Sequence, residues 1–372
     1  MSEILIDGFT LTNSWLQDQI EREHGCRPRV LKVEPLGPDA VGYMSVIRRV
    51  HLEWYSDRSE LPKSVIVKIP CTTAAGDASE SADATMKDLD TYSLGRISHT
   101  LETKFYRFLQ NEKQKSLLAP MIYVAEGYDS EQPVIVMEDY RNCSVMDVVD
   151  GFSEKQLFAV FEQIANLQAL SIRNKHWITI LKDDEKCMRK QLVSIASSQT
   201  RSMSQKLLED MPEQFSCLKT FLANTIDKDP EWINVILDQY DSGVLWRDEN
   251  TLAGIVDWQF VHRASPVEDI LCVLALSTST ANRRKLLHPL LDHYYEKMKE
   301  QLGADMPFSR EYLDDELKFV APWCCMWAVG DAALFINSNM VIRNGEVCSE
   351  RVDEIVQRCV SFVEDVITLC GW

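Results

Sequence analysis

Hydrophobic and polar positions in the first third of the chain follow both helix-like and strand-like patterns. A polar-apolar pattern with Thr and Asn capping options predicts a helix over residues 12–23. A second helix is predicted at about 98–112. Five short alternating or β-branched runs are typical of strands, at 29–35, 44–54, 63–70, 121–127 and 132–138. The pattern therefore predicts five strands, with the second helix after the third strand.

The rest of the chain is predicted to be mostly helical. Residues 153–172 form an amphipathic pattern with Ser153 as N-cap, and further helices follow as far as 360–369. The apolar run 319–330 fits a buried helix. One β-like segment interrupts the helices, with apolar runs 243–246 and 253–256 joined by a polar turn, which predicts a hairpin.

Length and composition fit an ordinary globular protein with two domains or one large bilobal domain. The chain has 372 residues, of which 45% are hydrophobic and 26% are charged. Disorder, collagen and coiled coil are excluded as descriptions of the whole chain. Residues 71–90 are small, polar and acidic, and they are predicted to be the most mobile segment. The change of pattern places the boundary between a first domain, 1–139, and a second, 140–372.

Charge and cysteine usage exclude several classes of partner. There are 39 Lys and Arg residues against 57 Asp and Glu residues, so the formal net charge is −18. Neither nucleic acid nor a lipid surface is an expected partner, because no basic footprint is present. We expect no signal peptide, no membrane helix and no zinc site, and the 11 cysteines without metal spacing predict reduced thiols in the cytoplasm. A small anionic ligand is still possible, since it needs only one or two local cations or a metal ion.

Lys68 and Glu102 are the first candidates for chemistry. Lys68 lies near the end of a β-branched run, V-I-V-K-I, where it is either an edge lysine that reaches water or a lysine that holds phosphates. Glu102 lies beside the apolar stripe of the following predicted helix, so it is either solvated or within reach of the strand lysine. Both alternatives stay open for each residue.

Two aspartates flank the predicted hairpin. Asp257 directly follows an apolar strand, which suits a metal-binding carboxylate and also suits a residue that starts a turn. Asp238 precedes the hairpin. One metal ligand and one base that orients a nucleophile would account for the pair.

Several motifs in this order resemble the CHK domain family, the choline/ethanolamine-kinase-like and ecdysteroid-kinase-like small-molecule kinases. That family belongs with the aminoglycoside phosphotransferases in the protein-kinase-like fold. The resemblance covers about 9–367, with Gln168 standing where a histidine is usual in the family. The motifs that match are V-L-W at 244–246, I-V-D-W-Q at 255–259, His262, Pro266, Glu268-Asp269, V-I-V-M-E-D at 134–139 and I-A-N-L-Q-A-L-S at 164–171.

The resemblance implies a fold, a reaction and two cofactors. The fold would be α+β and bilobal: a small N-lobe with a five-stranded antiparallel sheet plus a helix, and a larger, mostly helical C-lobe. The reaction would transfer the γ-phosphate of ATP, with Mg²⁺, to the hydroxyl of a small-molecule alcohol. The acidic chain would suit a cationic or neutral alcohol, but the sequence specifies neither the alcohol nor an oligomeric state.

The resemblance also implies a role for each matched residue. Lys68 would contact the phosphates and pair with Glu102, Asp257 would bind Mg²⁺, and Asp238 would be the catalytic base. The remaining implied nucleotide-binding residues are Gly37 and Gly42 in a phosphate-covering loop and Glu138, Asp139 and Tyr140 along the adenine edge.

The catalytic loop departs from the family pattern H-G-D-L-W-x-x-N. Ile236 and Leu237 replace the histidine and glycine, and Gly243 replaces the asparagine that ligates the second metal. Asp241, an oxygen donor two residues before Gly243, would be the substitute metal ligand. Two functions therefore stay open: an active small-molecule kinase, or a pseudokinase that keeps nucleotide or ligand binding as a binding or regulatory module.

Overall fold

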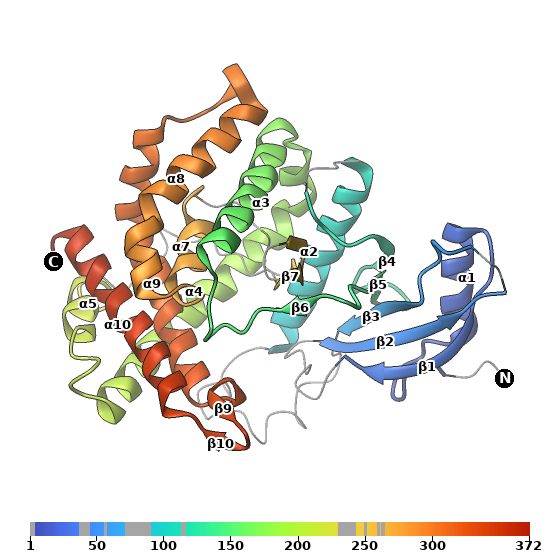
Figure 1. Ribbon diagram of the computed structural model, residues 1–372, viewed down its shortest axis with the longest axis horizontal. Helices are drawn as coiled ribbons and strands as arrows, with labels where there is room; N and C mark the ends of the chain where they lie inside the picture. Colours follow the sequence, from blue (N-terminus) through green and yellow to red (C-terminus); the bar gives the residue numbers. More distant parts are fainter. Residues whose placement is uncertain are drawn as a thin grey trace. The chain divides into compact units, whose positions relative to one another are not determined.

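The computed structural model describes residues 4–36, 45–55, 58–70, 91–112, 117–229, 243–248, 251–258, 261 and 265–372 (Figure 1). Its chain divides into two compact units. The first comprises Met1–Cys143, Asp241–Leu245 and Ala253–Val261, and the second comprises Ser144–Tyr240, Trp246–Leu252 and His262–Trp372. The division after Cys143 lies close to the expected boundary, but segments around the predicted hairpin join the first unit from far along the sequence.

The first unit contains a five-stranded antiparallel sheet, as predicted, with the strand order β1-β2-β3-β5-β4. The helix α2 lies between β3 and β4 in the sequence, which confirms the predicted element order. The predicted mobile segment, 71–90, lies outside the described residues. The elements of this unit are α1 (Asn13–His24), β1 (Arg29–Pro35), β2 (Ser45–Glu53), β3 (Ser64–Pro70), α2 (Thr91–Glu112), β4 (Ile122–Glu126) and β5 (Val134–Glu138).

Local sequence signals explain where the first helices begin and end. The Thr12 side chain accepts a hydrogen bond from the Trp15 backbone N–H, and Gly25 ends α1 in the left-handed conformation, at φ 70°. The helix α2 begins at Thr91, earlier than the predicted residue 98. Gly95, near the start of α2, has a low helix propensity, which weakens the helical signal of residues 91–97.

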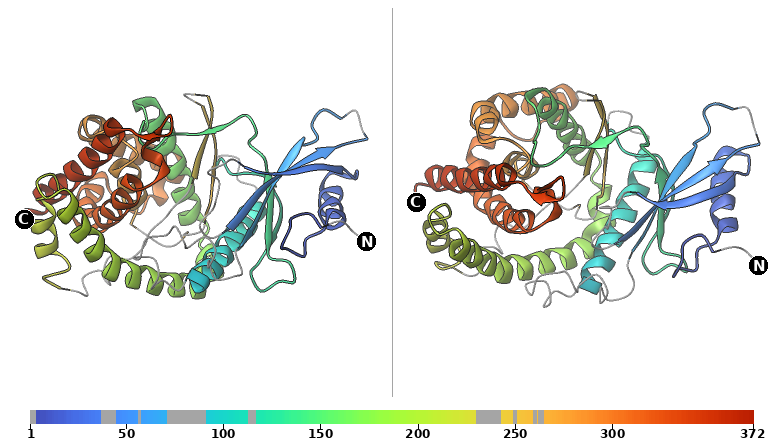
Figure 2. Two further views of the ribbon diagram at one scale, coloured as in Figure 1. Left: turned by 90° about the horizontal axis from the view of Figure 1, so that it is seen from below. Right: turned by 60° about the horizontal axis from the view of Figure 1, so that its bottom comes forward.

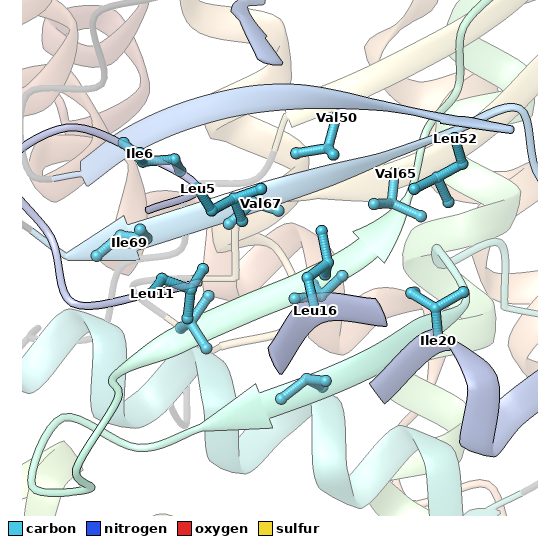
Figure 3. Packing of buried hydrophobic residues seen from close by; sticks show 13 residues of the cluster. Leu5, Ile6, Leu11, Leu16, Ile20, Val50, Leu52, Val65, Val67 and Ile69 are labelled. Atoms are coloured by element: carbon cyan, nitrogen blue, oxygen red, sulfur yellow. The ribbon is translucent and has the colours of Figure 1, made fainter. Parts of the chain in front are cut away.

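The two faces of the sheet have different partners. Leu16 and Ile20 of α1 form an apolar cluster with residues of one face, among them Val65 and Val67 of β3 (Figure 3). Successive strand residues point to opposite faces, so Lys68 points away from this cluster. All seven residues of β3 are nevertheless buried. A lysine in such a strand must find its partners inside the protein.

The second unit is mostly helical. Its helix α3 begins as predicted, with Ser153 and Gln156 forming a capping box. The helix α3 packs against α8, and α9 packs against α10 (Figure 2). The β7–β8 pair is the predicted hairpin, and it contributes residues to both units. The elements from Ser144 onward are β6 (Ser144–Val145), α3 (Glu154–Arg173), α4 (His176–Asp210), α5 (Leu218–Asn224), β7 (Gly243–Asp248), β8 (Thr251–Val256), α7 (Glu268–Ala275), α8 (Thr280–Leu302), η2 (Gly303–Asp305), α9 (Arg310–Ile336), η3 (Asn339–Val341), β9 (Ile342–Arg343), β10 (Glu346–Val347) and α10 (Ser349–Cys370).

The helix α9 contains the apolar run that the sequence predicted to be buried. Trp323, Cys324 and Cys325 are all at most 1% exposed. Within the described part of the chain, α9 is also the one helix long and apolar enough to cross a membrane, and 61% of that apolar window is buried inside the protein. A mostly buried core helix of a soluble protein can have the same length and composition.

A buried arginine of α10 fixes the segment that follows β6. The Arg358 guanidinium donates hydrogen bonds to the carbonyl oxygens of Val148, Val149 and Leu276, at 2.6–2.8 Å. Gly151 lies directly against it, at φ 75°, and a Cβ at this glycine would meet the Arg358 Nη2 at 2.9 Å. The start of the second unit is therefore held by side chain to main chain hydrogen bonds.

The apolar cluster under the sheet gives a stability prediction. Leu16 is fully buried in it, so Leu16→Ala should lower the free energy of unfolding by about 2–5 kcal/mol through lost burial and a residual cavity. Leu31 of β1 is 52% exposed, and Leu31→Ala should change stability by less than about 0.5 kcal/mol. Urea unfolding measures both values. Similar losses for the two variants would contradict this packing.

Candidate functional site

Lys68 lies between two carboxylates of the first unit. Its Nζ donates hydrogen bonds to both carboxylate oxygens of Glu102, at 3.0 and 2.8 Å, and to Oδ1 of Asp257, at 2.7 Å. Lys68 comes from β3, Glu102 from α2 and Asp257 from the end of β8. The structure thus brings together three of the residues singled out from the sequence, and the solvated alternatives for Lys68 and Glu102 are wrong.

The three groups differ in exposure. The side chains of Lys68 and Glu102 are 4% and 0% exposed, whereas that of Asp257 is 45% exposed. Burial by itself lowers the pKa of Lys68, but the negative charges of Glu102 and Asp257 outweigh it, so the pKa is raised and the ammonium stays protonated. Burial raises the pKa of Glu102 to about 7, although the charge of Lys68 opposes the rise. Asp257 is the member of the group whose carboxylate reaches the exposed side.

Asp257 is held in an uncommon backbone conformation. Its φ is 70°, in the left-handed region that few residues other than glycine adopt, although aspartate tolerates it better than most. On its N-terminal side, the Ile255 N–H donates to the Leu118 carbonyl oxygen at 2.9 Å. On its C-terminal side, the buried Trp258 donates from Nε1 to the Ile255 carbonyl oxygen at 3.2 Å. Such strain is typical of functional positions.

The helix α2 supports Asp257 as well as Lys68. Phe105 lies one helical turn after Glu102, and its ring packs on the Trp258 ring with the centroids 4.5 Å apart. One rigid helix therefore sets the position of the Lys68 partner and of the residue next to Asp257.

The predicted adenine-edge segment, Glu138 to Tyr140, follows β5. The Asp139 side chain is 2% exposed and accepts two hydrogen bonds from Arg49, from Nε at 2.7 Å and from Nη2 at 3.0 Å. The Ser64 hydroxyl donates a third hydrogen bond, at 2.5 Å. The Glu138 carboxylate accepts from the Met121 backbone N–H at 3.1 Å. Both carboxylates are thus engaged within the protein, and contact of this segment with a nucleotide stays a prediction.

Strand register relates this segment to Lys68. In the β3–β5 pair, Val65 lies opposite Glu138 and Lys68 lies opposite Ile135. Three residues of strand separate the two positions, which is about 10 Å. On the Lys68 face, the opposed pair Ile66 and Met137 lies between them. Along the Lys68 face of the sheet, Lys68 is therefore followed by the apolar pair Ile66 and Met137, and then by the main chain that follows β5.

Four predicted site residues lie outside the described residues. They are Gly37, Gly42, Asp238 and Asp241, and the replaced positions Ile236 and Leu237 lie outside them as well. Gly243 is the first residue of β7. Among the described residues, no group of three or more His, Cys, Asp and Glu side chains could hold a metal ion. Asp257 is the one predicted metal ligand that the structure places, which is compatible with Mg²⁺, since that ion commonly takes one or two carboxylates together with substrate phosphates.

The second unit contains a buried polar cluster around Gln168. Gln168 donates to Asp269 Oδ2 at 2.9 Å, and the Tyr294 hydroxyl donates to Gln168 Oε1. Burial raises the pKa of Asp269 to about 6, although the Gln168 hydrogen bond opposes the rise. The residue that replaces the usual family histidine is therefore the centre of a network that links α3, α7 and α8.

The chain belongs to the DUF1679 family, whose description is "Uncharacterized oxidoreductase dhs-27" and whose match covers residues 31–370. A Caenorhabditis elegans protein with that same name is 25% identical over 78% of this chain. The match spans only 37% of that relative, so its name describes a protein much longer than the matched part. A second C. elegans relative, "Uncharacterized kinase-like protein D1044.1", is 22% identical over 84% of this chain and 86% of its own length. The family is thus CHK-like and kinase-like in fold, as the sequence resemblance implies.

Solved small-molecule kinases also match the chain. A Plasmodium vivax ethanolamine kinase aligns with 10% identity over 90% of this chain and 84% of its own, with a TM-score of 0.47. An aminoglycoside phosphotransferase in complex with AMP-PNP and hygromycin B aligns with 10% identity over 94% of this chain and 97% of its own, with a TM-score of 0.34.

The raised pKa of Asp269 gives a pH prediction. An acid whose pKa rises from 3.8 to about 6 on folding destabilises the folded state above pH 6 by about 3 kcal/mol, and this penalty disappears as the pH falls through 6 towards 4. In Asp269→Asn the penalty is absent, so stability should change less between pH 4 and pH 7 than in the wild type. Urea unfolding at the two pH values measures the change. The exposed Asp305→Asn is the control, and a wild-type pH dependence in Asp269→Asn would contradict the shift.

Proposed function

We propose that this DUF1679 protein binds ATP with Mg²⁺ and transfers the γ-phosphoryl group to a hydroxyl of a small molecule. The supporting observation is the buried, protonated Lys68 held between Glu102 and Asp257. Phosphoryl transfer depends mostly on positioning and on neutralisation of charge, with little covalent chemistry for the protein to do. The fixed Lys68 ammonium and the more exposed Asp257 carboxylate would supply this positioning and this neutralisation of charge.

Each of the three side chains has a distinct part in this proposal. Glu102 keeps Lys68 in place and cannot itself reach solvent, since it is fully buried. Lys68 would donate hydrogen bonds to phosphate oxygens when Asp257 binds another cation in place of the Lys68 ammonium. Asp257 is the exposed member and takes Mg²⁺, which when bound neutralises charge on the phosphate oxygens.

The sheet face next to Lys68 suits the rest of a nucleotide. In this proposal a flat base packs on the opposed Ile66 and Met137, which are apolar and each 7% exposed, and the 138–140 main chain lies beyond them. About 10 Å along the strand pair separates the strand position of Glu138 from that of Lys68. A nucleoside triphosphate has the same order of parts, from an apolar base to an anionic end.

The residues proposed to act on the substrate hydroxyl are assigned from the sequence alone. Asp238 is proposed as the base that accepts the proton of the substrate hydroxyl, and Asp241 as a further metal ligand. The net charge of −18 favours a neutral or cationic alcohol over an anionic one. The kinase-like relative agrees in class, and its name specifies no substrate.

A second candidate function is a pseudokinase that binds nucleotide with little transfer. The observation that favours it is the loss of the family residues at Ile236, Leu237 and Gly243. Loss of one catalytic electrostatic group typically costs ~10²–10³ in rate. Nucleotide binding would survive these changes, because Lys68, Glu102 and Asp257 come from other segments.

The Lys68 site predicts Mg²⁺-dependent stabilisation by ATP. Wild-type protein should show a higher Tm with ATP and Mg²⁺ than with either alone, because a ligand that binds only the folded state stabilises it. Lys68→Met should remove most of this increase, since the phosphates lose their buried cation. The matched control is Lys63→Met, which changes an exposed lysine just before the same strand. An equal ATP effect in Lys68→Met and wild type would refute the assignment of Lys68.

Phosphotransfer separates the two candidate functions. If the protein is an active kinase, ADP release with a panel of small alcohols should fall by about 10²-fold or more in Asp238→Asn, because the substrate hydroxyl loses its base. If neither wild type nor Asp238→Asn releases ADP above background while ATP still raises the Tm, the protein is a pseudokinase. An equal, measurable rate in both proteins shows instead that Asp238 is not the base. A coupled ADP assay with both proteins distinguishes these outcomes.

A further inference from the structure

The most constrained polar contact near the proposed base site is the cluster of Arg49, Ser64 and Asp139. Three hydrogen bonds, at 2.5–3.0 Å, converge on the Asp139 carboxylate. Arg49 is on β2 and Ser64 is on β3, so the cluster joins the segment after β5 to two other strands. The Asp139 side chain is 2% exposed and that of Arg49 is 20% exposed.

The register of the sheet places this cluster on the same face as Lys68. Arg49 lies opposite Ile66 in the β2–β3 pair, and residues in direct opposition share a face. Ser64, Ile66 and Lys68 alternate along β3, so they share that face as well. The cluster therefore lies at one end of the apolar stretch, and Lys68 lies at the other.

Asp139 also shapes the main chain around it. Its carbonyl oxygen accepts a hydrogen bond from the Arg141 N–H at 2.7 Å, and the Tyr140 carbonyl oxygen accepts one from the Cys143 N–H at 2.9 Å. The Glu138 N–H donates to the Met121 carbonyl oxygen at 2.8 Å. The path of the 138–143 segment is thus set by its own turn and by the anchored Asp139 side chain.

We propose that Arg49 is a positioning residue for recognition of the nucleotide base, because it holds Asp139 and so fixes the main chain of 138–140. This inference rests on the proposed function. Arg49 acts through Asp139 and contacts no reacting group. Base recognition at this segment then uses main-chain groups, since both neighbouring carboxylates are engaged within the protein.

An arginine is required for this role. The planar guanidinium donates two parallel hydrogen bonds to one carboxylate, whereas a lysine ammonium is a point charge on a flexible stem. Arg49→Lys keeps the charge beside the buried Asp139 but loses the two-point geometry. This substitution therefore loosens the segment without leaving a buried charge unpaired, which would cost much more stability.

The test compares a ligand that has a base with one that has none. Affinities for ATP and for inorganic tripolyphosphate, both with Mg²⁺, are measured by calorimetry on wild type and Arg49→Lys. We expect the Kd for ATP to rise at least about tenfold in Arg49→Lys, in line with a lost charged hydrogen bond, and the Kd for tripolyphosphate to change less than about twofold. Arg29→Lys is the matched control, because Arg29 pairs with Glu53 at the exposed side of the same sheet.

A second variant, Ser64→Ala, tests the proposal if Arg49→Lys folds poorly. Ser64→Ala removes one donor to Asp139 and keeps the two Arg49 hydrogen bonds, so it should weaken ATP selectively and by a smaller factor. An unchanged ATP affinity, or an equal loss for both ligands, overturns the positioning role and leaves the proposed function intact. Failure of wild type to bind either ligand overturns the proposed function, and this inference with it.

Discussion

The buried ammonium of Lys68 is the constraint on which the rest of the candidate site depends. A charged lysine that cannot reach water is costly unless carboxylates surround it, and two are present, Glu102 and Asp257. Each partner comes from a distant part of the sequence. The requirement to pair one charge therefore fixes β3, α2 and the end of β8 relative to one another inside the first unit.

The surrounding elements follow from that pairing. One face of the sheet is committed to the apolar cluster with α1, which leaves the other face for Lys68 and its partners. The helix α2 supplies Glu102 and, one turn later, Phe105, which packs on Trp258 beside Asp257. A shift of α2 would move both carboxylates together. The site is thus built on rigid elements, which suits chemistry that depends on positioning.

Strand and helix periodicity in the sequence was enough to predict the five strands, the helix between the third and fourth, and the helical remainder. Positions near the ends of apolar strands and beside the apolar stripe of a helix were enough to make Lys68, Glu102 and Asp257 candidates. Other features needed the tertiary structure. The hydrogen bonds that Arg49 donates to Asp139 depend on the register between strands, and the pattern of one strand does not reveal that register. Alternation in β2 could still have placed Arg49 on the face that points away from the apolar cluster. The left-handed conformation of Asp257 likewise has no signal in an I-V-D-W sequence.

The central claim is that Asp257 and Lys68 together receive the metal-bound phosphates of ATP. The most direct measurement is calorimetric titration of ATP with and without Mg²⁺, into wild type and Asp257→Asn. The account predicts that Mg²⁺ tightens ATP binding by wild type at least about tenfold, a difference of about 1.4 kcal/mol. It predicts that Asp257→Asn loses this gain. Equal wild-type affinities with and without Mg²⁺, or an undiminished gain in Asp257→Asn, would contradict it.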